Sequence, residues 1–345
     1  MTRLLLTMAM VLLWALAAGC SGPVARDPTA DRAAAAPPGA EGAATDTPVS
    51  SDVLPPYVPV VGLTGKITSI GASTTTNLVA RLAVEFRRMY PDVTLQVIAS
   101  PISIGPAALL EGRADLVPMS RPLTPEEVQG FTEKYGYPPT EIKVAADALA
   151  IFVQKQNPIS GLTLAQLDGI YSRTQKRGGG SIEKWGQAGL TGEWADRPIV
   201  VYGYGRDDGA HEFFRQQVMD GGEFRLSLRS EGGGSAATQG VASDPAAIGC
   251  ASIFFACKRV RAVPLAGADA RFYAPTAENV RSGKYPLGRF LTVCVNKPPR
   301  RPFGGPAAEF LRFLFSRDGQ RIVADGGNFS LDPATAQESR RALAE

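Results

Sequence analysis

Residues 67–91 read ITSIGASTTTNLVARLAVEFRRMYP, and this stretch decides the fold class. Its first four residues form a β-rich run, which predicts a strand. Six small residues follow (71–76, GASTTT), and then apolar residues recur at helical spacing: Leu78, Val79, Leu82, Ala83, Phe86 and Met89. Ser73 or Thr74 suits the N-cap of that helix, and Pro91 ends it. The stretch therefore predicts a strand, a small polar turn and a helix.

The same pattern continues along the chain. Residues 93–99 predict a strand, 100–105 a loop, 106–113 a short helix, and 115–119 another strand that ends before Ser120. Strands that alternate with helices predict an α/β fold with a mostly parallel sheet. In such sheets ligands bind at the carboxyl ends of the strands, where helix N-termini present free N–H groups.

A second lobe is predicted after the long apolar run 142–154 (IKVAADALAIFVQ), which is long enough to cross from one lobe to the other. It contains a strand at 199–202, the charged loop 203–209 (GYGRDDG) and a helix with Phe213 on one face. The expected organisation is as follows: signal peptide 1–19, disordered tether 20–60, lobe 1 at 61–147 plus 252–332, lobe 2 at 148–251, and a C-terminal tail at 333–345.

The N-terminus has the layout of an export signal. Arg3 precedes an apolar run, and residues 16–20 (LAAGC) resemble a bacterial lipobox, in which Cys20 is lipidated and anchors the protein to a membrane. The alternative is a single uncleaved membrane anchor, although the apolar run is short for one. Residues 21–59 are rich in Ala, Pro, Gly and Thr, which predicts a disordered, semi-stiff tether. Either reading places the remaining chain outside the cytoplasm, facing the periplasm or the cell exterior.

Composition excludes several classes of protein. The chain has 345 residues, 44% hydrophobic and 20% charged, with a net charge of +3, which is typical of a globular protein. Its basic residues are scattered, so nucleic-acid binding is not expected. The four cysteines and the single histidine, His211, lack metal-ligand spacing, so we expect no metal and no cofactor. One disulfide among Cys250, Cys257 and Cys294 fits an exported protein, but the sequence does not select the pair.

Several motifs resemble those of the phosphate-binding proteins of ABC transporters. Residues 71–74 (GAST) are similar to the family's turn before the first helix, and 110–123 (LEGRADLVPMSRPL) is similar to its most specific segment. Residues 162–171 with Trp185, and 239–249 (QGVASDPAAIG), resemble two further family segments. The resemblance implies a two-lobed periplasmic-binding-protein-like fold (type II) with a ligand cleft between the lobes. It also implies a monomer that captures inorganic phosphate or a related oxyanion for an inner-membrane ABC permease, without enzymatic activity.

The expected oxyanion-binding residues lie at strand-to-helix loops. Hydroxyls and guanidinium groups are the donors that a desolvated oxyanion needs, and a carboxylate accepts the proton of hydrogen phosphate. The candidates are Ser73, Thr74, Ser103, Ser120, Arg121, Arg206, Asp207, Asp208 and Gly209.

One segment departs from the family pattern. The second-lobe loop of the family reads Arg followed by Ser-Gly-Thr, whereas Arg206 is followed here by Asp207, Asp208 and Gly209, with no hydroxyl. Each candidate also has a structural interpretation: an N-cap for Ser73 or Thr74, an ion pair for each arginine, and helix-start charges for the two aspartates. The lobes could even close on a salt-bridged network without an anion. The competing function is therefore a degenerate phosphate-binding fold that acts as a sensor or protein-interaction module.

Overall fold

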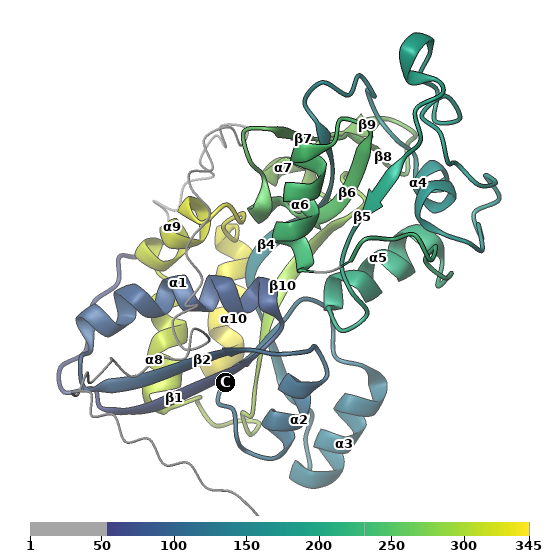
Figure 1. Ribbon diagram of the computed structural model, residues 1–345. Coiled ribbons are helices and arrows are strands. Elements are labelled where there is room, and N and C mark those ends of the chain that lie inside the picture. Colours follow the sequence, from purple (N-terminus) through teal and green to yellow (C-terminus); the bar gives the residue numbers. More distant parts are fainter. Residues whose placement is uncertain (1–53, 231, 345) are drawn as a thin grey trace, which may run out of the picture. The chain divides into compact units, whose positions relative to one another are not determined.

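Figure 1 shows the computed structural model, which describes residues 54–230 and 232–344. The expected signal peptide, the lipidated Cys20 and most of the tether lie outside the described residues. Within the described ranges, no helix is long and apolar enough to cross a membrane. The described residues all belong to one compact unit. All three hydrophobic cores of the described residues lie in it.

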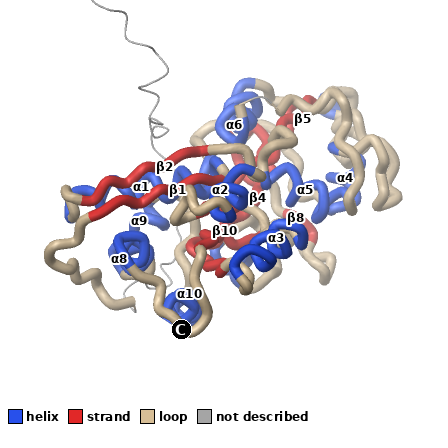
Figure 2. Tube along the Cα trace, turned by 90° about the horizontal axis from the view of Figure 1, so that it is seen from below, coloured by secondary structure: helices blue, strands red, loops and turns tan. Residues whose placement is uncertain are grey.

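The opening stretch folds as the sequence predicts. Strand β1 (Gly65–Gly71) pairs in parallel with β2 (Val93–Ala99), and helix α1 (Ser73–Met89) connects them. Figure 2 shows α1 lying along this strand pair. Ala72, however, is the N-cap residue of α1, and no side chain caps the helix. The N-cap interpretation of Ser73 and Thr74 is therefore wrong, and both hydroxyls are left for other partners.

The main sheet is mixed rather than mostly parallel. Its order is β3-β10-β4-β6-β5, with β7 beside β4. Strand β10 (Gly288–Val295) runs antiparallel to β3 (Val117–Met119) and to β4 (Thr140–Gln154). Strand β4 also runs antiparallel to β6 (Ala247–Ser252), which pairs in parallel with β5 (Val200–Tyr202). The α/β class is confirmed. The sheet is mixed because β4, its central strand, pairs in antiparallel fashion with both β10 and β6.

Strand β4 connects two hydrophobic cores, as its length predicts. Ile142 and Val144 belong to the core under β1, β2 and α1, which we call the first core. Residues 148–153 belong to a second core. A third, smaller core lies under α2 (Ile104–Leu110) and α3 (Pro125–Tyr135) and includes Phe131. The strand therefore takes part in both halves of the described chain, pairing with β10 in its first part and with β6 and β7 in its second.

The second core is built from the middle of the chain. Its elements are α4 (Leu164–Tyr171), the 3-10 turn Gly192–Trp194, β5, α5 (Gly209–Met219), α6 (Gly233–Ser243), β6, the 3-10 turn Ile253–Phe255, β7 (Val260–Ala262), β8 (Leu265–Ala266), β9 (Phe272–Tyr273) and α7 (Ala277–Arg281). Val263, Tyr285 and Leu287 pack in this core. The return to the first core thus comes at β10, later than the expected boundary at residue 252, because β7 pairs with β4 and the segment up to Leu287 packs in the second core.

The C-terminal segment packs on the first core. It comprises α8 (Gly305–Leu314), α9 (Arg317–Asp325) and α10 (Pro333–Ala344). The residues expected to form a tail are therefore helical, and Ser339 Oγ of α10 donates to the carbonyl of Lys143 at 3.0 Å. Leu54 is also buried, so the folded part begins before the expected end of the tether. Cys250, Cys257 and Cys294 are free thiols.

Candidate functional site

The candidate site forms where β1 and β3 end beside the start of α1. Gly71 allows this close approach, because a Cβ on it would lie 2.1 Å from the carbonyl oxygen of Pro118. The Ala72 amide donates to that same oxygen at 2.8 Å, which ties the two strand ends together. The turn of small residues thus places Ser73 and Thr74 directly after this contact, and Ser120 lies two residues beyond Pro118 on the other strand.

Ser73 contacts a residue of the charged loop 203–209. Its Oγ donates to Oδ2 of Asp208 at 3.0 Å. Asp208 is the N-cap of α5, and its Oδ1 accepts from the Ala210 amide at 2.8 Å. A carboxylate therefore sits between the starting turns of α1 and α5, a position that the N-terminal N–H groups and helix dipoles make favourable for negative charge.

Two further contacts join the same loops. The Ile102 amide donates to the carbonyl of Asp207 at 3.0 Å. Gly209 is buried, and a Cβ on it would lie only 2.5 Å from Ser120 Oγ. A side chain at this position would therefore displace the Ser120 hydroxyl or separate the two loops.

Two hydroxyls at the site are buried without a partner. Ser120 is 1% exposed and Thr74 is 2% exposed, and neither side-chain oxygen has a hydrogen-bond partner in the described part of the chain. By contrast, the neighbouring Thr75 Oγ1 donates to the carbonyl of Met119 at 2.8 Å. A buried polar group left unpaired costs about 1–3 kcal/mol. Such hydroxyls mark a place where a polar ligand would compensate the cost.

Four of the predicted site residues do not converge here. Arg121 donates to both carboxylate oxygens of Glu127 at 2.8 Å, so the structural ion-pair interpretation holds for it. Arg206 and Asp207 are exposed, and neither side chain has a hydrogen bond or ion pair with the described residues. Ser103 is the exposed N-cap of α2 and makes no side-chain cap bond. The salt-bridged network of Arg206 with Asp208 is therefore not formed.

A buried ion pair below the site was missed from the sequence. Arg289 Nε donates to Asp147 Oδ2 at 3.0 Å, and its Nη1 donates to the Ser120 carbonyl at 3.1 Å. Ser252 Oγ donates to Asp147 Oδ1 at 2.6 Å. Burial raises the pKa of the Asp147 carboxyl, and Arg289 opposes that shift. The signal was the lone carboxylate of Asp147 in an apolar strand, which needs a buried partner.

His211 lies in the first turn of α5, directly after the charged loop 203–209. Its Nδ1 lies 2.9 Å from the carbonyl of Tyr204, and its ring packs on Phe224 with centroids 4.1 Å apart. Burial lowers the pKa of His211. The ring is therefore neutral near pH 7 and donates its Nδ1 proton to that carbonyl, which is a structural role.

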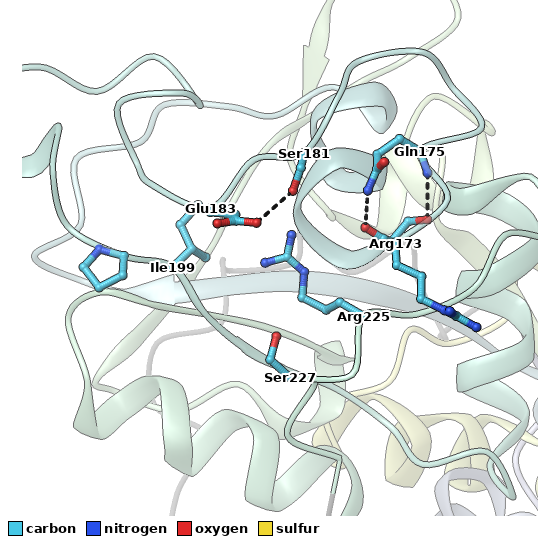
Figure 3. A pocket seen from close by; sticks show the side chains of 9 residues that line it. Arg173, Gln175, Ser181, Glu183, Ile199, Arg225 and Ser227 are labelled. Atoms are coloured by element: carbon cyan, nitrogen blue, oxygen red, sulfur yellow. Dashed lines mark hydrogen bonds between the residues drawn. The ribbon is translucent and has the colours of Figure 1, made fainter.

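A separate pocket lies on the second core (Figure 3). Arg225 lies between Glu183 and Ser227 in it. The Nη2 group of Arg225 donates to the carbonyls of Gly169 and Ile182, at 3.1 and 3.3 Å. None of the predicted oxyanion residues lines this pocket. The arginine therefore connects α4 to the loop that contains Ile182. The candidate site remains the junction of Ser73, Ser120 and Asp208.

Known proteins share this fold and sequence. A protein from Clostridium perfringens solved with bound phosphate has a TM-score of 0.64 at 24% identity, covering 77% of this chain and 100% of its own. An ABC-type phosphate transport receptor from Vibrio cholerae has a TM-score of 0.60 at 24% identity, with the same coverage. The fold is thus that of the two-lobed periplasmic-binding proteins, as the sequence predicts.

The sequence comparisons assign the family. The family model of the PBP superfamily domain (PBP_like_2) matches residues 37–318. The phosphate-binding protein PstS of Pseudomonas aeruginosa is 38% identical over 304 residues, which cover 88% of this chain and 94% of that protein. SphX of Synechococcus elongatus is 26% identical over 67% of this chain and 68% of its own length. The chain belongs to the PstS family of phosphate-binding proteins.

Proposed function

We propose that this protein captures phosphate, or a closely related oxyanion, outside the cytoplasm and delivers it to an inner-membrane ABC permease. Family membership supports a solute-binding role in phosphate transport. The observation that carries the proposal is the pair of buried, unpartnered hydroxyls of Thr74 and Ser120 beside the start of α1. The protein acts as a monomeric receptor and performs no chemistry on its ligand.

The geometry suits hydrogen phosphate. Ser73, Thr74 and Ser120 supply hydroxyl donors, and the first turns of α1 and α5 supply backbone N–H groups. Arg289 lies directly behind Ser120, where it donates to the Ser120 carbonyl while paired with Asp147. Asp208 accepts the proton that hydrogen phosphate carries, whereas sulfate carries none at neutral pH and is repelled. Binding then shifts an equilibrium between open and closed lobes.

A second function is favoured by a specific observation. Asp208 already bonds to Ser73, so a carboxylate of the chain itself takes a position suited to an anion. Arg121 is committed to Glu127. These two contacts are what a degenerate receptor would show if it bound no phosphate and served as a sensor or protein-interaction module.

The lipid anchor and the lobe boundaries belong to the same proposal. Cys20 is the lipidated residue, and the tether expected at residues 20–60 follows it. Lobe 1 combines the first and third cores, and lobe 2 is the second core. The oxyanion site includes Ser73, Thr74, Ser120, Asp208 and Gly209, with Ser103, Arg206 and Asp207 as exposed residues that reach the ligand on lobe closure.

Isothermal titration of the fragment 37–345 tests the proposal. The fragment is unfolded and refolded to remove carried-over ligand, and is then titrated with phosphate, arsenate and sulfate. We expect saturable heat with phosphate and arsenate and none with sulfate. Ser120→Ala weakens phosphate binding by about tenfold or more, because a hydrogen bond to a charged group is lost. A folded protein that gives no heat with all three anions supports the degenerate receptor instead.

A further inference from the structure

A groove between α8 and α10 is lined by both apolar and cationic side chains. It has a volume of about 760 Å³, and its lining includes Leu63, Phe303, Leu343, Arg312, Arg340 and Arg341. The Phe303 amide donates to the carbonyl of Leu343 at 2.9 Å, which joins the segment just before α8 to α10. The groove lies near Gly65, at the amino end of β1, whereas Ser73 follows the carboxyl end of that strand. It is therefore separate from the oxyanion site.

Cationic side chains border this groove without counter-charges. Arg300, Arg301, Arg340 and Arg341 are exposed, and none of these four side chains forms a hydrogen bond or ion pair with the residues that the structure describes. Arg312, in contrast, is paired with Glu309 at 2.6 Å. The charges of these four arginines are therefore not neutralised by contacts among the described residues, which leaves them available to an anionic partner.

Exposed apolar side chains lie beside the same groove. Val58, Val60 and Val61 have exposed fractions of 68%, 41% and 103%. Their backbone is nevertheless held in place, since Arg312 Nη2 donates to the Val58 carbonyl and the Val60 amide donates to Tyr90 Oη, both at 2.9 Å. Fixed, exposed valines next to unpaired arginines form a surface that is apolar and cationic at once, which is the composition of interfacial membrane-binding segments.

We propose that this surface docks on a membrane of anionic phospholipids. We call it the α8–α10 face and define it by Val58, Val60, Val61, Arg300, Arg301, Arg340 and Arg341. The arginines bind lipid phosphates and the valines enter the headgroup region. Docking through this face leaves the carboxyl end of β1, with Ser73, directed away from the bilayer.

Vesicle co-sedimentation tests the proposal with the fragment 37–345, which contains every described core. Vesicles of phosphatidylcholine alone are compared with vesicles of equal parts phosphatidylcholine and phosphatidylglycerol, at low and at physiological ionic strength. We expect binding to the anionic vesicles that weakens with salt. The variant R300Q/R301Q/R340Q/R341Q lowers the bound fraction at least about tenfold.

A matched variant controls for net charge. K155Q/K176Q/R259Q/K284Q removes the same number of exposed positive charges from the second core's surface, and it should bind anionic vesicles as the unaltered protein does. Equal loss in the two variants, equal binding to neutral vesicles, or no binding to anionic vesicles would overturn the proposal and point to a protein partner for this face. The readout requires no phosphate, so it is independent of the proposed ligand capture.

Discussion

Ser73 and Asp208 are separated by 135 residues in the chain, yet the Ser73 hydroxyl donates to the Asp208 carboxylate at 3.0 Å. This hydrogen bond joins the start of α1 on the first core to the start of α5 on the second. It also places a negative charge of the chain in a position suited to a bound oxyanion. The proposed phosphate capture therefore requires this contact to rearrange, with Asp208 becoming the acceptor of the phosphate proton.

Asp208→Asn tests that role of the carboxylate. The amide no longer repels a dianion without a proton, so we expect phosphate to bind less tightly and sulfate to become a ligand. The ratio of phosphate to sulfate affinity should fall by about tenfold or more, because a charge-assisted hydrogen bond is lost for one ligand and a repulsion is removed for the other. Isothermal titration measures both affinities. Asp220→Asn is the matched control, since Asp220 is exposed and lies at the opposite end of α5, and an equal effect there would contradict the assignment.

Gly209→Ala tests whether the loops must meet for binding. The added methyl group would lie 2.5 Å from Ser120 Oγ and 3.1 Å from Ile102 Cδ1. The clash is relieved if the two loops separate, so phosphate affinity should fall by about tenfold or more while the melting temperature changes little. Gly130→Ala, in open space on α3, should leave phosphate affinity unchanged. A Gly209→Ala protein that binds phosphate normally would show that this contact is not used.

Breaking the buried ion pair should cost far more stability than breaking a surface pair. Asp147→Asn leaves Arg289 as an uncompensated buried charge, and we expect a loss of about 3–5 kcal/mol in the free energy of unfolding. The double variant Asp147→Leu/Arg289→Met should be less destabilised than either single variant. Arg88→Ala, which breaks the exposed pair with Glu85, should cost less than about 1 kcal/mol. Urea unfolding measures each value, and additive single effects would argue against a coupled pair.

His211 makes the stability depend on pH. Burial lowers its pKa in the folded state, so between that value and the ordinary pKa of about 6.5 the unfolded chain binds a proton that the folded chain does not. The neutral ring therefore contributes its full share of the free energy of unfolding above about pH 6.5. This contribution is lost as the pH falls from there toward the lowered pKa of the folded state. We expect His211→Gln to flatten the decrease in unfolding free energy between pH 7 and pH 5. An unchanged pH slope would contradict the buried, neutral assignment.

Local patterns predict much of this structure, and long-range pairing explains the rest. The turn 71–76 and the apolar run 142–154 are sufficient to predict the α/β class and the connection between two cores. These stretches do not predict the direction of β10, because that direction depends on pairing with strands distant in the chain. Arg289 was missed for the same reason, since only the register that places it opposite Asp147 reveals its partner.

The ion pair between Arg121 and Glu127, in contrast, is predictable from the local sequence. Thr124 and Glu127 form a capping box at the start of α3, and that box holds the Glu127 carboxylate six residues from Arg121. The motif predicts a fixed carboxylate within reach of the guanidinium. Ser73, Ser120 and Asp208, in contrast, were correctly expected at strand-to-helix loops, and their convergence follows from the way the sheets place those loops together.

The most direct test of phosphate capture is a crystal structure of the fragment 37–345 with arsenate, located by the anomalous scattering of arsenic. We predict one strong peak between the start of α1 and the start of α5, within hydrogen-bond distance of Ser73 and Ser120, with Asp208 turned from Ser73 to the anion. An unoccupied site with the hydrogen bond between Ser73 and Asp208 still in place, at saturating arsenate, would contradict the account and leave a phosphate-receptor fold with another task.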